Sequence, residues 1–403
     1  MNRVIQWGLL LWSSMSAAVC LCQVAQSVEN QRQSALVLEQ QGKNAEAETV
    51  WRALLKRLPE NPEPYAHMGL IEARQEHYKA AVPLYRKALM LSPSTPGLRL
   101  NLGLALFKTG EMKEAVQIFE KLLKSQTLSS TEVKRFSILV GMGHYALGEF
   151  PDAVPYLKQA VTGDPQNLGL RLSLAHSCLW SKQYQCVLDS YREILSLNAE
   201  SAEADMLAGE ALDELKDYDG AIKQFRAAVQ ANPKEPDVHF GLGYLLWTQR
   251  QYDEAASELQ AELSNNPNQV QALLYLGDAQ LQMRHIEVAL PILEQVERTA
   301  PTLSLGHLDL GILYADAGRN EEALRELNIA EKLTPGDVNV HWRLGRLYRA
   351  MGKKDEAKAE LDKACNLNKA TDVALINKMS GAEVNSNPRG ATAKGASDSR
   401  LER

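Results

Sequence analysis

One pattern constrains the fold of this chain more than any other: small residues and prolines recur in register with a period of 34. When units begin at residues 28, 62, 96, 134, 168, 202, 236, 270, 304 and 338, position 8 is Gly in eight units and Ala in two. Position 20 is Ala in nine units, and position 32 is Pro in seven. Self-similarity at this period is typical of a stacked array in which each unit buries its apolar face against its neighbours. We therefore predict an all-α protein, an α-solenoid of about ten helical hairpins without a single central core.

Each unit is predicted to contain two helices. In the unit that begins at residue 338, an apolar stripe at helical spacing contains Leu344, Leu347 and Tyr348, and a second stripe follows at Leu361 and Ala364. Between the stripes, position 15 is Gly in five units, and Gly accepts the left-handed conformation that ends a helix. The Pro at position 32 separates the units because it lacks an N–H donor. The small residues at positions 8 and 20 are predicted to lie where the two helices cross.

Two sequence features predict where particular helices begin. Pro62, Pro96 and Pro236 fall at position 1 of their units, where a helix start tolerates proline. The fourth unit begins 38 residues after the third rather than 34, and Ser129 with Glu132 forms a capping box in the extra segment. Four residues make about one helical turn, so the insertion is predicted to lengthen the first helix of the fourth unit.

These units resemble the tetratricopeptide repeat, whose pattern has Leu-Gly at positions 7–8, an aromatic residue at position 11, Ala at 20 and Pro at 32. The clearest matches are Leu310-Gly311 with Tyr314 and Leu344-Gly345 with Tyr348. The resemblance covers residues 28–371 and implies a right-handed solenoid of tetratricopeptide (TPR) units. It also implies that the first helices line a concave protein-binding groove through positions 2, 5, 9, 12 and 13. The fifth unit departs from the pattern, with Ala175, Val187 and Ala199 in place of Gly, Ala and Pro.

The N-terminal residues differ in character from the array. Arg3 precedes a mostly apolar stretch from Val4 to Trp12, and small residues follow, which is the order typical of a secretory signal. Residues 1–22 are therefore predicted to be a signal peptide cut after Cys20 or Cys22, and the protein to be exported, periplasmic or secreted. Two alternatives stay open. One is an uncleaved membrane anchor, because Val4 to Cys22 is near the lower length for a span, and the other is a bacterial lipoprotein modified at Cys20.

Removal of the signal leaves three cysteines, Cys178, Cys186 and Cys365, and an odd number does not indicate a disulfide framework. Cys178 and Cys186 lie on facing helices of the fifth unit and are able to pair in an oxidising compartment. The favoured interpretation is a packing role, because Cys178 occupies the slot where other units carry an aromatic residue or Leu. Beyond the array, residues 372–403 are predicted to form a short capping helix that ends near Ser380, then a disordered tail.

The sequence contains no pattern typical of an enzyme or of a metal site. His239, His307 and His341 all occupy position 4, where the family places large side chains, so their recurrence follows from the repeat itself. There is no His-Glu-x-x-His, Walker-type loop, nucleophile elbow or Cys-x-x-Cys. The chain is therefore predicted to be non-catalytic and to hold no cofactor and no metal. A net charge of −6 without any basic run argues against nucleic acid as the partner.

The residues that do not repeat are the candidates for partner binding. The first helix of unit six carries five acids and no base, and aromatic residues flank it on both sides. Acids beside aromatic faces suit a basic or proline-containing extended segment through ion pairing and cation–π contact. The predicted contact residues are His176 and Trp180 in unit five; Glu203, Glu210, Asp213 and Glu214 in unit six; Phe240, Tyr244 and Trp247 in unit seven; and Trp342, Arg346 and Arg349 in unit ten.

Two functions follow from these expectations. The first is a non-catalytic scaffold of the cell envelope or exterior that captures partner polypeptides in the concave groove. The alternative is a membrane-attached structural subunit of a secretion, pilus or polysaccharide-export assembly. In both cases the partners are proteins or extended peptide segments, and the membrane is contacted only through the N-terminal segment.

Overall fold

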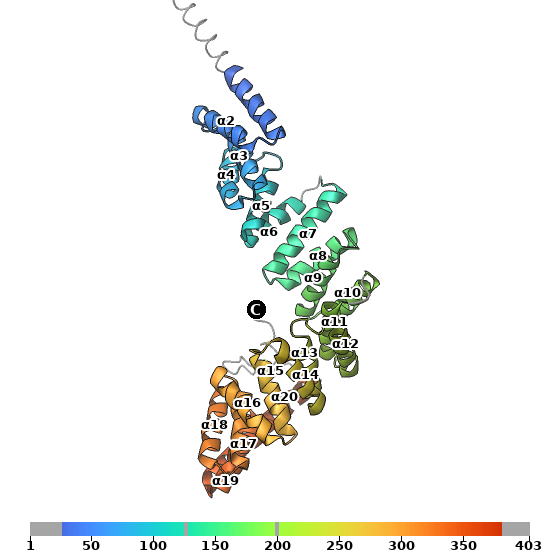
Figure 1. The fold of residues 1–403 in the computed structure, drawn as a ribbon, viewed down its shortest axis with the longest axis vertical. Coiled ribbons are helices and arrows are strands. Elements are labelled where there is room, and N and C mark those ends of the chain that lie inside the picture. Colours follow the sequence, from blue (N-terminus) through green and yellow to red (C-terminus); the bar gives the residue numbers. More distant parts are fainter. Residues whose placement is uncertain (1–25, 125–127, 198–200, 381–403) are drawn as a thin grey trace, which may run out of the picture. The chain divides into compact units, whose positions relative to one another are not determined.

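The computed structural model describes residues 26–124, 128–197 and 201–380 (Figure 1). All regular secondary structure in these ranges is helical, which confirms the predicted all-α solenoid. No helix within them is both long and apolar enough to cross a membrane. The predicted signal or anchor at residues 1–22 and the tail beyond Ser380 lie outside the described residues.

The helices pair into hairpins, one hairpin for each 34-residue repeat. In repeats one to five they are the helix of residues 26–40, α2 (Asn44–Arg57), α3 (Pro62–Arg74), α4 (Tyr78–Leu91), α5 (Leu98–Thr109), α6 (Met112–Leu123), α7 (Ser130–Ala146), α8 (Phe150–Gly163), α9 (Leu168–Trp180) and α10 (Tyr184–Leu197). In repeats six to ten they are α11 (Ala202–Glu214), α12 (Tyr218–Ala231), α13 (Val238–Thr248), α14 (Tyr252–Asn265), α15 (Val270–Gln282), α16 (Ile286–Thr299), α17 (Ser304–Asp316), α18 (Asn320–Leu333), α19 (Val338–Ala350) and α20 (Lys354–Ser380).

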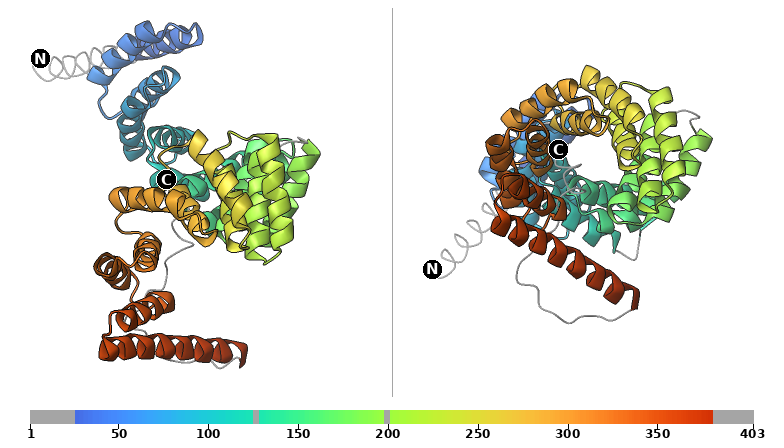
Figure 2. Two further views of the ribbon diagram at one scale, coloured as in Figure 1. Left: turned by 60° about the horizontal axis from the view of Figure 1, so that its bottom comes forward. Right: turned by 90° about the horizontal axis from the view of Figure 1, so that it is seen from below.

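The chain divides into two compact units, residues 1–199 with repeats one to five and residues 200–403 with repeats six to ten. Within each unit, a hairpin packs against the hairpins before and after it (Figure 2). In the second unit the first helices α11, α13, α15, α17 and α19 also contact one another in sequence order. They form one continuous face, which we name the first-helix face.

The glycines at position 8 lie where the two helices of a hairpin cross, as predicted. A Cβ atom on Gly69 would lie 2.8 Å from Tyr85 Cε1, and one on Gly243 would lie 2.8 Å from Leu259 Cγ. In both hairpins the contacting side chain occupies position 24, and the same pairing recurs in the other repeats that carry this glycine. Contacts this short leave no room for a methyl group, so position 8 sets how closely the helices approach.

The turn between the two helices has the same backbone in all ten hairpins. The N–H at position 16 donates to the carbonyl at position 11, as in Lys43 to Leu38 at 2.9 Å and Asp217 to Leu212 at 2.9 Å. Position 15 has a positive φ throughout, which together with that bond is the Schellman ending of a helix. Five repeats have the predicted Gly there, and five have a charged residue instead: Glu76, Lys182, Lys216, Arg250 and Arg284.

The predicted helix starts are partly correct. Pro62 is the first residue of α3, as predicted. Pro96 and Pro236 instead lie two residues ahead of α5 and α13, whose N-terminal caps Gly97 and Asp237 have a φ of 71° and 63°. A left-handed residue cannot continue a helix backwards, so the proline stays in the preceding turn.

The insertion before repeat four lengthens α7, as predicted. This helix has 17 residues, and the Ser129–Glu132 capping box is formed. The last repeat differs from the prediction, because residues 371–380 continue α20 as one helix of 27 residues rather than forming a separate short cap. Lys369 stands at position 32, where seven repeats have the Pro that stops a helix, so the sequence permits α20 to continue.

The fifth repeat folds as a hairpin in spite of its unusual residues, and it corrects the expectation for the cysteines. Cys178 on α9 and Cys186 on α10 form a disulfide, with their Cα atoms 5.9 Å apart. The packing role that the sequence favoured for Cys178 is therefore incomplete, because its side chain is both fully buried and covalently joined to the facing helix. Cys365 is a free and exposed thiol.

Candidate functional site

Four aromatic side chains form a cluster on the first-helix face of repeats seven and eight. Phe240, Tyr244 and Trp247 lie on one side of α13 because they are four and three residues apart, and Tyr275 comes from α15. The ring centroids of Tyr244 and Tyr275 are 4.9 Å apart, and those of Trp247 and Tyr275 are 4.8 Å apart. Phe240 is buried beneath, while the other three are half-buried. We name these four residues the aromatic cluster.

The aromatic cluster opens onto a pocket of about 260 Å³. Tyr244, Trp247 and Tyr275 line one side of it. Other lining residues come from repeat nine: Ser304 and Leu305 in the first turn of α17, and Thr334 and Asp337 in the turn between α18 and α19. Three consecutive repeats therefore contribute to this cavity, which we name the aromatic pocket.

A buried pair of carboxyl groups lies behind Trp247. Asp278 on α15 is 3% exposed and Asp309 on α17 is 1% exposed. Asp278 accepts hydrogen bonds from the indole N–H of Trp247 and from Gln282 Nε2, the latter at 2.9 Å. The two carboxyl groups interact closely enough to shift each other's pKa, and Asp309 Oδ2 is buried without a hydrogen-bond partner. We name Asp278 and Asp309 the carboxyl pair.

The two members of the carboxyl pair differ in protonation. Burial raises the pKa of both, and the negative charge of Asp278 raises the pKa of Asp309 further, well above its usual value. Hydrogen bonds from Gln282 and Trp247 favour the ionised form of Asp278. Asp309 is therefore the member of the pair that more strongly favours the protonated form, and Asp278 is the member whose ionised form is favoured by hydrogen-bond donors.

The predicted acids of repeat six lie on α11, the helix that contacts α13. Glu203, Glu210 and Asp213 are half-buried, and Glu214 is exposed. They share this helix at positions 2, 9, 12 and 13, and their part in binding stays a prediction.

The predicted residues of repeat five belong to the other compact unit. His176 packs edge-on against Tyr145, with centroids 6.3 Å apart, and Trp180 stacks on Phe150 at 5.5 Å. The structure therefore brings together the three residues predicted in repeat seven, but it places those of repeat five in a separate ring cluster.

The predicted residues of repeat ten lie on α19. Trp342 is 43% exposed, and the guanidinium carbon of Arg346 lies 4.8 Å from its ring centroid. Arg349 is exposed one turn further on. Arg343, which was not predicted, lies 5.3 Å from the same ring and is half-buried, and burial lowers the pKa of its guanidinium.

Sequence reasoning missed Tyr275, Asp278, Asp309 and Arg343 as candidate site residues. Tyr275, Asp309 and Arg343 all occupy position 6 of their repeats, which was not among the positions taken to face the groove. The residue at position 6 differs between repeats and is aromatic or charged in the last three, so this variability was the available signal. Asp278 occupies position 9, which is apolar in the first four repeats and often polar or charged in the later ones.

The position-4 histidines have the structural role that the sequence predicted. His307 Nδ1 lies 2.8 Å from Glu326 on the facing helix, and its Nε2 lies 2.9 Å from the carbonyl oxygen of Pro301 in the preceding repeat. His341 makes the same two contacts, with Glu360 at 2.7 Å and Pro335 at 2.9 Å. Each ring therefore joins the two helices of its own hairpin and ties them to the previous hairpin.

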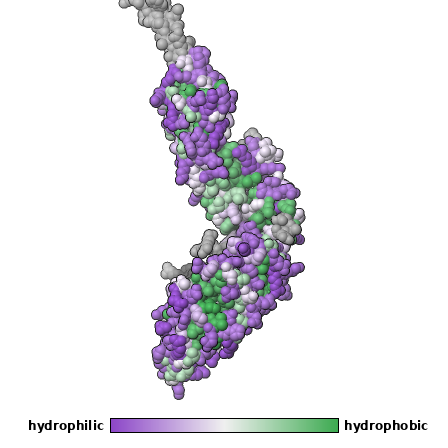
Figure 3. All heavy atoms as spheres, viewed as in Figure 1, coloured by the Kyte–Doolittle hydropathy of each residue, from purple (hydrophilic) through white to green (hydrophobic). Residues whose placement is uncertain are grey.

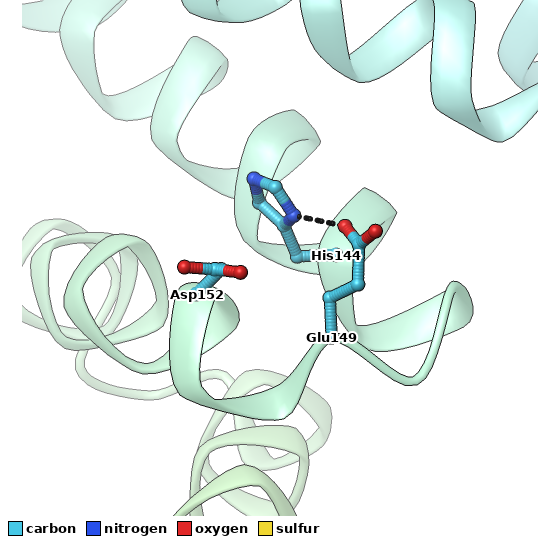
Figure 4. Close-up of side chains that lie close together, drawn as sticks. All are labelled: His144, Glu149 and Asp152. Carbon is cyan, nitrogen blue, oxygen red and sulfur yellow. Dashed lines mark hydrogen bonds and ion pairs between the residues drawn. The ribbon is translucent and has the colours of Figure 1, made fainter.

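Two groups of histidine and carboxylate side chains in the described ranges have the proximity that a metal site needs. In the first, His144 Nδ1 lies 2.7 Å from Glu149, with Asp152 opposite (Figure 4). Glu149 and Asp152 lie at the N-terminus of α8, where acidic residues stabilise the helix dipole. The second group contains Glu331, His341 and Glu360. Lys363 lies 3.1 Å from Glu331 and 2.8 Å from Glu360, so a positive charge is already present there. We assign both groups to ion pairing, and the absence of a metal stays a prediction.

Hydrophobic patches interrupt a largely hydrophilic surface in both compact units (Figure 3).

Among solved structures, the chain is similar to a MamA protein from Desulfovibrio magneticus RS-1, at 20% identity over 42% of this chain and 97% of that one, with a TM-score of 0.39. It is also similar to YrrB, described as a TPR protein with an unusual peptide-binding site, at 19% identity over 47% and 97% with a TM-score of 0.38. The Cut9–Hcn1 structure matches 88% of this chain and 90% of its own at 14% identity, with a TM-score of 0.42.

No curated protein sequence matches the chain significantly. Two family models described as tetratricopeptide repeat do match it, one at residues 72–136 and 214–276 and the other at residues 33–89, 188–236 and 308–371. Together they cover more than half of the chain, and they coincide with the hairpins described above. The chain therefore belongs to the tetratricopeptide repeat family.

Proposed function

We propose that this protein is a non-catalytic scaffold that captures an extended polypeptide segment on the first-helix face of repeats seven to nine. The observation that carries the proposal is the aromatic cluster, because three partly exposed rings open onto a pocket. Aromatic anchors of this kind dominate the energy of protein–peptide contacts, since they bury a large area at a small cost in side-chain entropy. The acids on α11 favour a basic or proline-containing segment.

The test uses random dodecamer peptides displayed on phage, selected on the purified full chain, followed by affinity measurements on the selected peptides. We expect Tyr244→Ala to weaken their binding about tenfold or more, as for a hot-spot aromatic residue. Trp247 is the poorer choice for this test, because its loss also removes one of the two hydrogen-bond donors to the buried Asp278. Circular dichroism of each variant checks that the helices are retained.

Tyr252→Ala is the matched control, since it removes a half-buried tyrosine of the same repeat from the second helix, α14. Its affinity for the selected peptides should stay within about twofold of the wild type. Trp342→Ala examines the rival contact residues on α19. The proposal is wrong if the selected peptides bind Tyr244→Ala as tightly as wild type, or if only Trp342→Ala weakens them.

We further propose that the scaffold acts in the cell envelope or outside the cell. The Cys178–Cys186 bond supports this location, because disulfides persist in oxidising compartments and are rare in the cytosol. Fractionation and the mass of the mature N-terminus test it. A soluble protein that begins near Leu21 or Gln23 is expected of an exported scaffold. A membrane-bound protein with lipidated Cys20 or retained Arg3 would instead favour a structural subunit of a secretion, pilus or polysaccharide-export assembly.

A further inference from the structure

The aromatic pocket has an unusual balance of chemistry. Its walls contain three aromatic rings, apolar leucines and one acid, Asp337, but no lysine, arginine or histidine. One carboxylate oxygen of Asp337 already accepts a hydrogen bond from the backbone N–H of Asn339 at 2.8 Å. A cavity with these walls suits a group that is apolar along its stem and positive at its end.

The carboxyl pair is joined by a hydrogen bond to one of the residues that line this pocket. Trp247 lines the pocket and donates its indole N–H to Asp278, so the carboxylate lies at the Nε1 edge of a ring that lines the cavity. A carboxylate that accepts from an indole N–H polarises the ring and makes its faces more negative. A cation attracted to an aromatic face responds to this negative charge.

The charge of Asp278 has no close cationic partner in the described parts of the chain. Neither Asp278 nor Asp309 forms a salt bridge there. The nearest positive influence is Arg343 on α19, which acts on Asp309 over a longer distance. Keeping an ionised carboxylate buried beside a second carboxyl group is costly, and an external cation in the aromatic pocket would offset that cost.

We propose that the aromatic pocket binds the side chain of a lysine or arginine in the captured segment, with Asp278 supplying the charge and Trp247 and Tyr275 the contact faces. This inference rests on the proposed function, because it names the residue type that the scaffold reads. The stem of the basic side chain packs on the rings and on the leucines, and its cationic head lies over the polarised indole. The carboxyl pair acts through Trp247 and does not contact the ligand.

The test uses two small probes, lysine methylamide and norleucine methylamide, each acetylated on the α-amino group. Their side chains are similar in length, but only the lysine side chain carries a positive charge. The full chain is labelled with 5-fluorotryptophan, and the resonance of Trp247 is assigned by its absence in Trp247→Phe. We expect the lysine probe to shift this resonance saturably, with an affinity at least about fivefold higher than that of the norleucine probe. Equal responses to the two probes would overturn the proposal.

Asp278→Asn tests the source of the charge, because Asn still offers an oxygen to the indole N–H. It should remove most of the preference for lysine over norleucine, a loss of about fivefold. Asp316→Asn is the matched control, since it removes one exposed charge from α17 outside the aromatic pocket, and it should preserve the preference. Equal losses in the two variants would show that only long-range charge matters and would contradict the inference.

The two proposals fail in different ways. If the small lysine probe binds at Trp247 but no selected peptide depends on Tyr244, the pocket exists and the capture of extended segments is wrong. If selected peptides depend on Tyr244 but tolerate replacement of every lysine and arginine by norleucine, the scaffold binds its partner and the basic-side-chain pocket is wrong.

Discussion

At the scale of single residues, the hairpin depends on the pairing of position 8 with position 24. In the eight repeats with glycine at position 8, position 24 is aromatic in some, as at Phe225, and Leu in others, as at Leu259, and the glycine faces both in the same geometry. The backbone approach is therefore constant while the side chain that fills the crossing changes. This explains how repeats with different core residues keep one common spacing.

Gly243→Ala measures this constraint. The new Cβ would lie 2.8 Å from Leu259 Cγ and 3.2 Å from the backbone N of Leu259, and the backbone cannot move aside as a flexible side chain could. We expect a loss of about 1–3 kcal/mol in the free energy of unfolding, measured by urea titration. Gly336→Ala is the control, because a Cβ there meets nothing within 4 Å. A cost at Gly243 no larger than at Gly336 would contradict the close-approach account.

Sequence reasoning found the position-8 glycines because the close approach of the two helices requires a small residue there. It found only half of the position-15 turns, since Lys216 and four other charged residues adopt the same left-handed conformation without being glycine. The backbone hydrogen bond from position 16 to position 11 holds the turn in place in every repeat. Tertiary context therefore overrides the local preference at these five positions.

At the scale of helices, the sequence predicted the extension of α7 but not the length of α20. The extension of α7 came from a countable insertion and a recognisable capping box. The length of α20 depended on a stop signal that is missing, and a missing proline permits a helix to continue without requiring it. Helix ends are fixed by such signals only where the signals are present.

The candidate site illustrates a different limit of sequence reasoning. Phe240, Tyr244 and Trp247 share one helix, and their helical spacing predicted that they would lie together. Asp278 and Asp309 belong to different hairpins, and their meeting depends on how far one repeat is rotated against the next. The period alone does not contain that angle, so the carboxyl pair could not be predicted from the sequence.

Asp309→Asn tests the protonation of the carboxyl pair. Because the pKa of Asp309 is raised in the folded protein, the folded state keeps a proton that the unfolded state releases above pH about 4. The stability that this proton provides is full at lower pH and declines as the pH rises toward the folded-state pKa. Asn carries no titrating proton, so the variant should gain stability relative to wild type between about pH 5 and pH 8.

The measurement is the free energy of urea unfolding at a series of pH values for wild type and variant. Glu262 also has a raised pKa through burial, but it is present in both proteins, so the difference between them reports the carboxyl pair as a unit. Asp316→Asn should give a curve parallel to wild type. A parallel curve for Asp309→Asn would show that the pKa of Asp309 is not raised in the folded protein.

At the scale of the whole molecule, the division after residue 199 has no counterpart in the repeat pattern. The spacing between repeats five and six is 34, as it is elsewhere, so periodicity gives no sign that the array divides there. The sequence predicts one patch from repeats five to seven, because the aromatic residues of repeats five and seven flank the acids of repeat six. In the structure they belong to two separately packed units.

The disulfide gives the first unit a redox-dependent stability. It joins residues that are eight apart in the sequence and therefore constrains a short loop of the unfolded chain. We expect reduction to lower the free energy of unfolding of this unit by about 2 kcal/mol. Thermal melts with and without dithiothreitol measure the effect, and the Cys178→Ala/Cys186→Ala double variant should no longer respond. An equal response of that variant would place the sensitivity elsewhere.

The aromatic pocket draws its walls from repeats seven, eight and nine, and this has a consequence for how the array opens locally. In a linear stack each hairpin opens at a free energy set by itself and its two neighbours. An occupant that touches three hairpins is released when any one of them opens, so its binding energy opposes all three openings at once. Amide hydrogens across residues 236–337 would then exchange at a common slow rate when the pocket is filled. Ligand binding would therefore make repeats seven, eight and nine unfold as one cooperative segment instead of opening semi-independently.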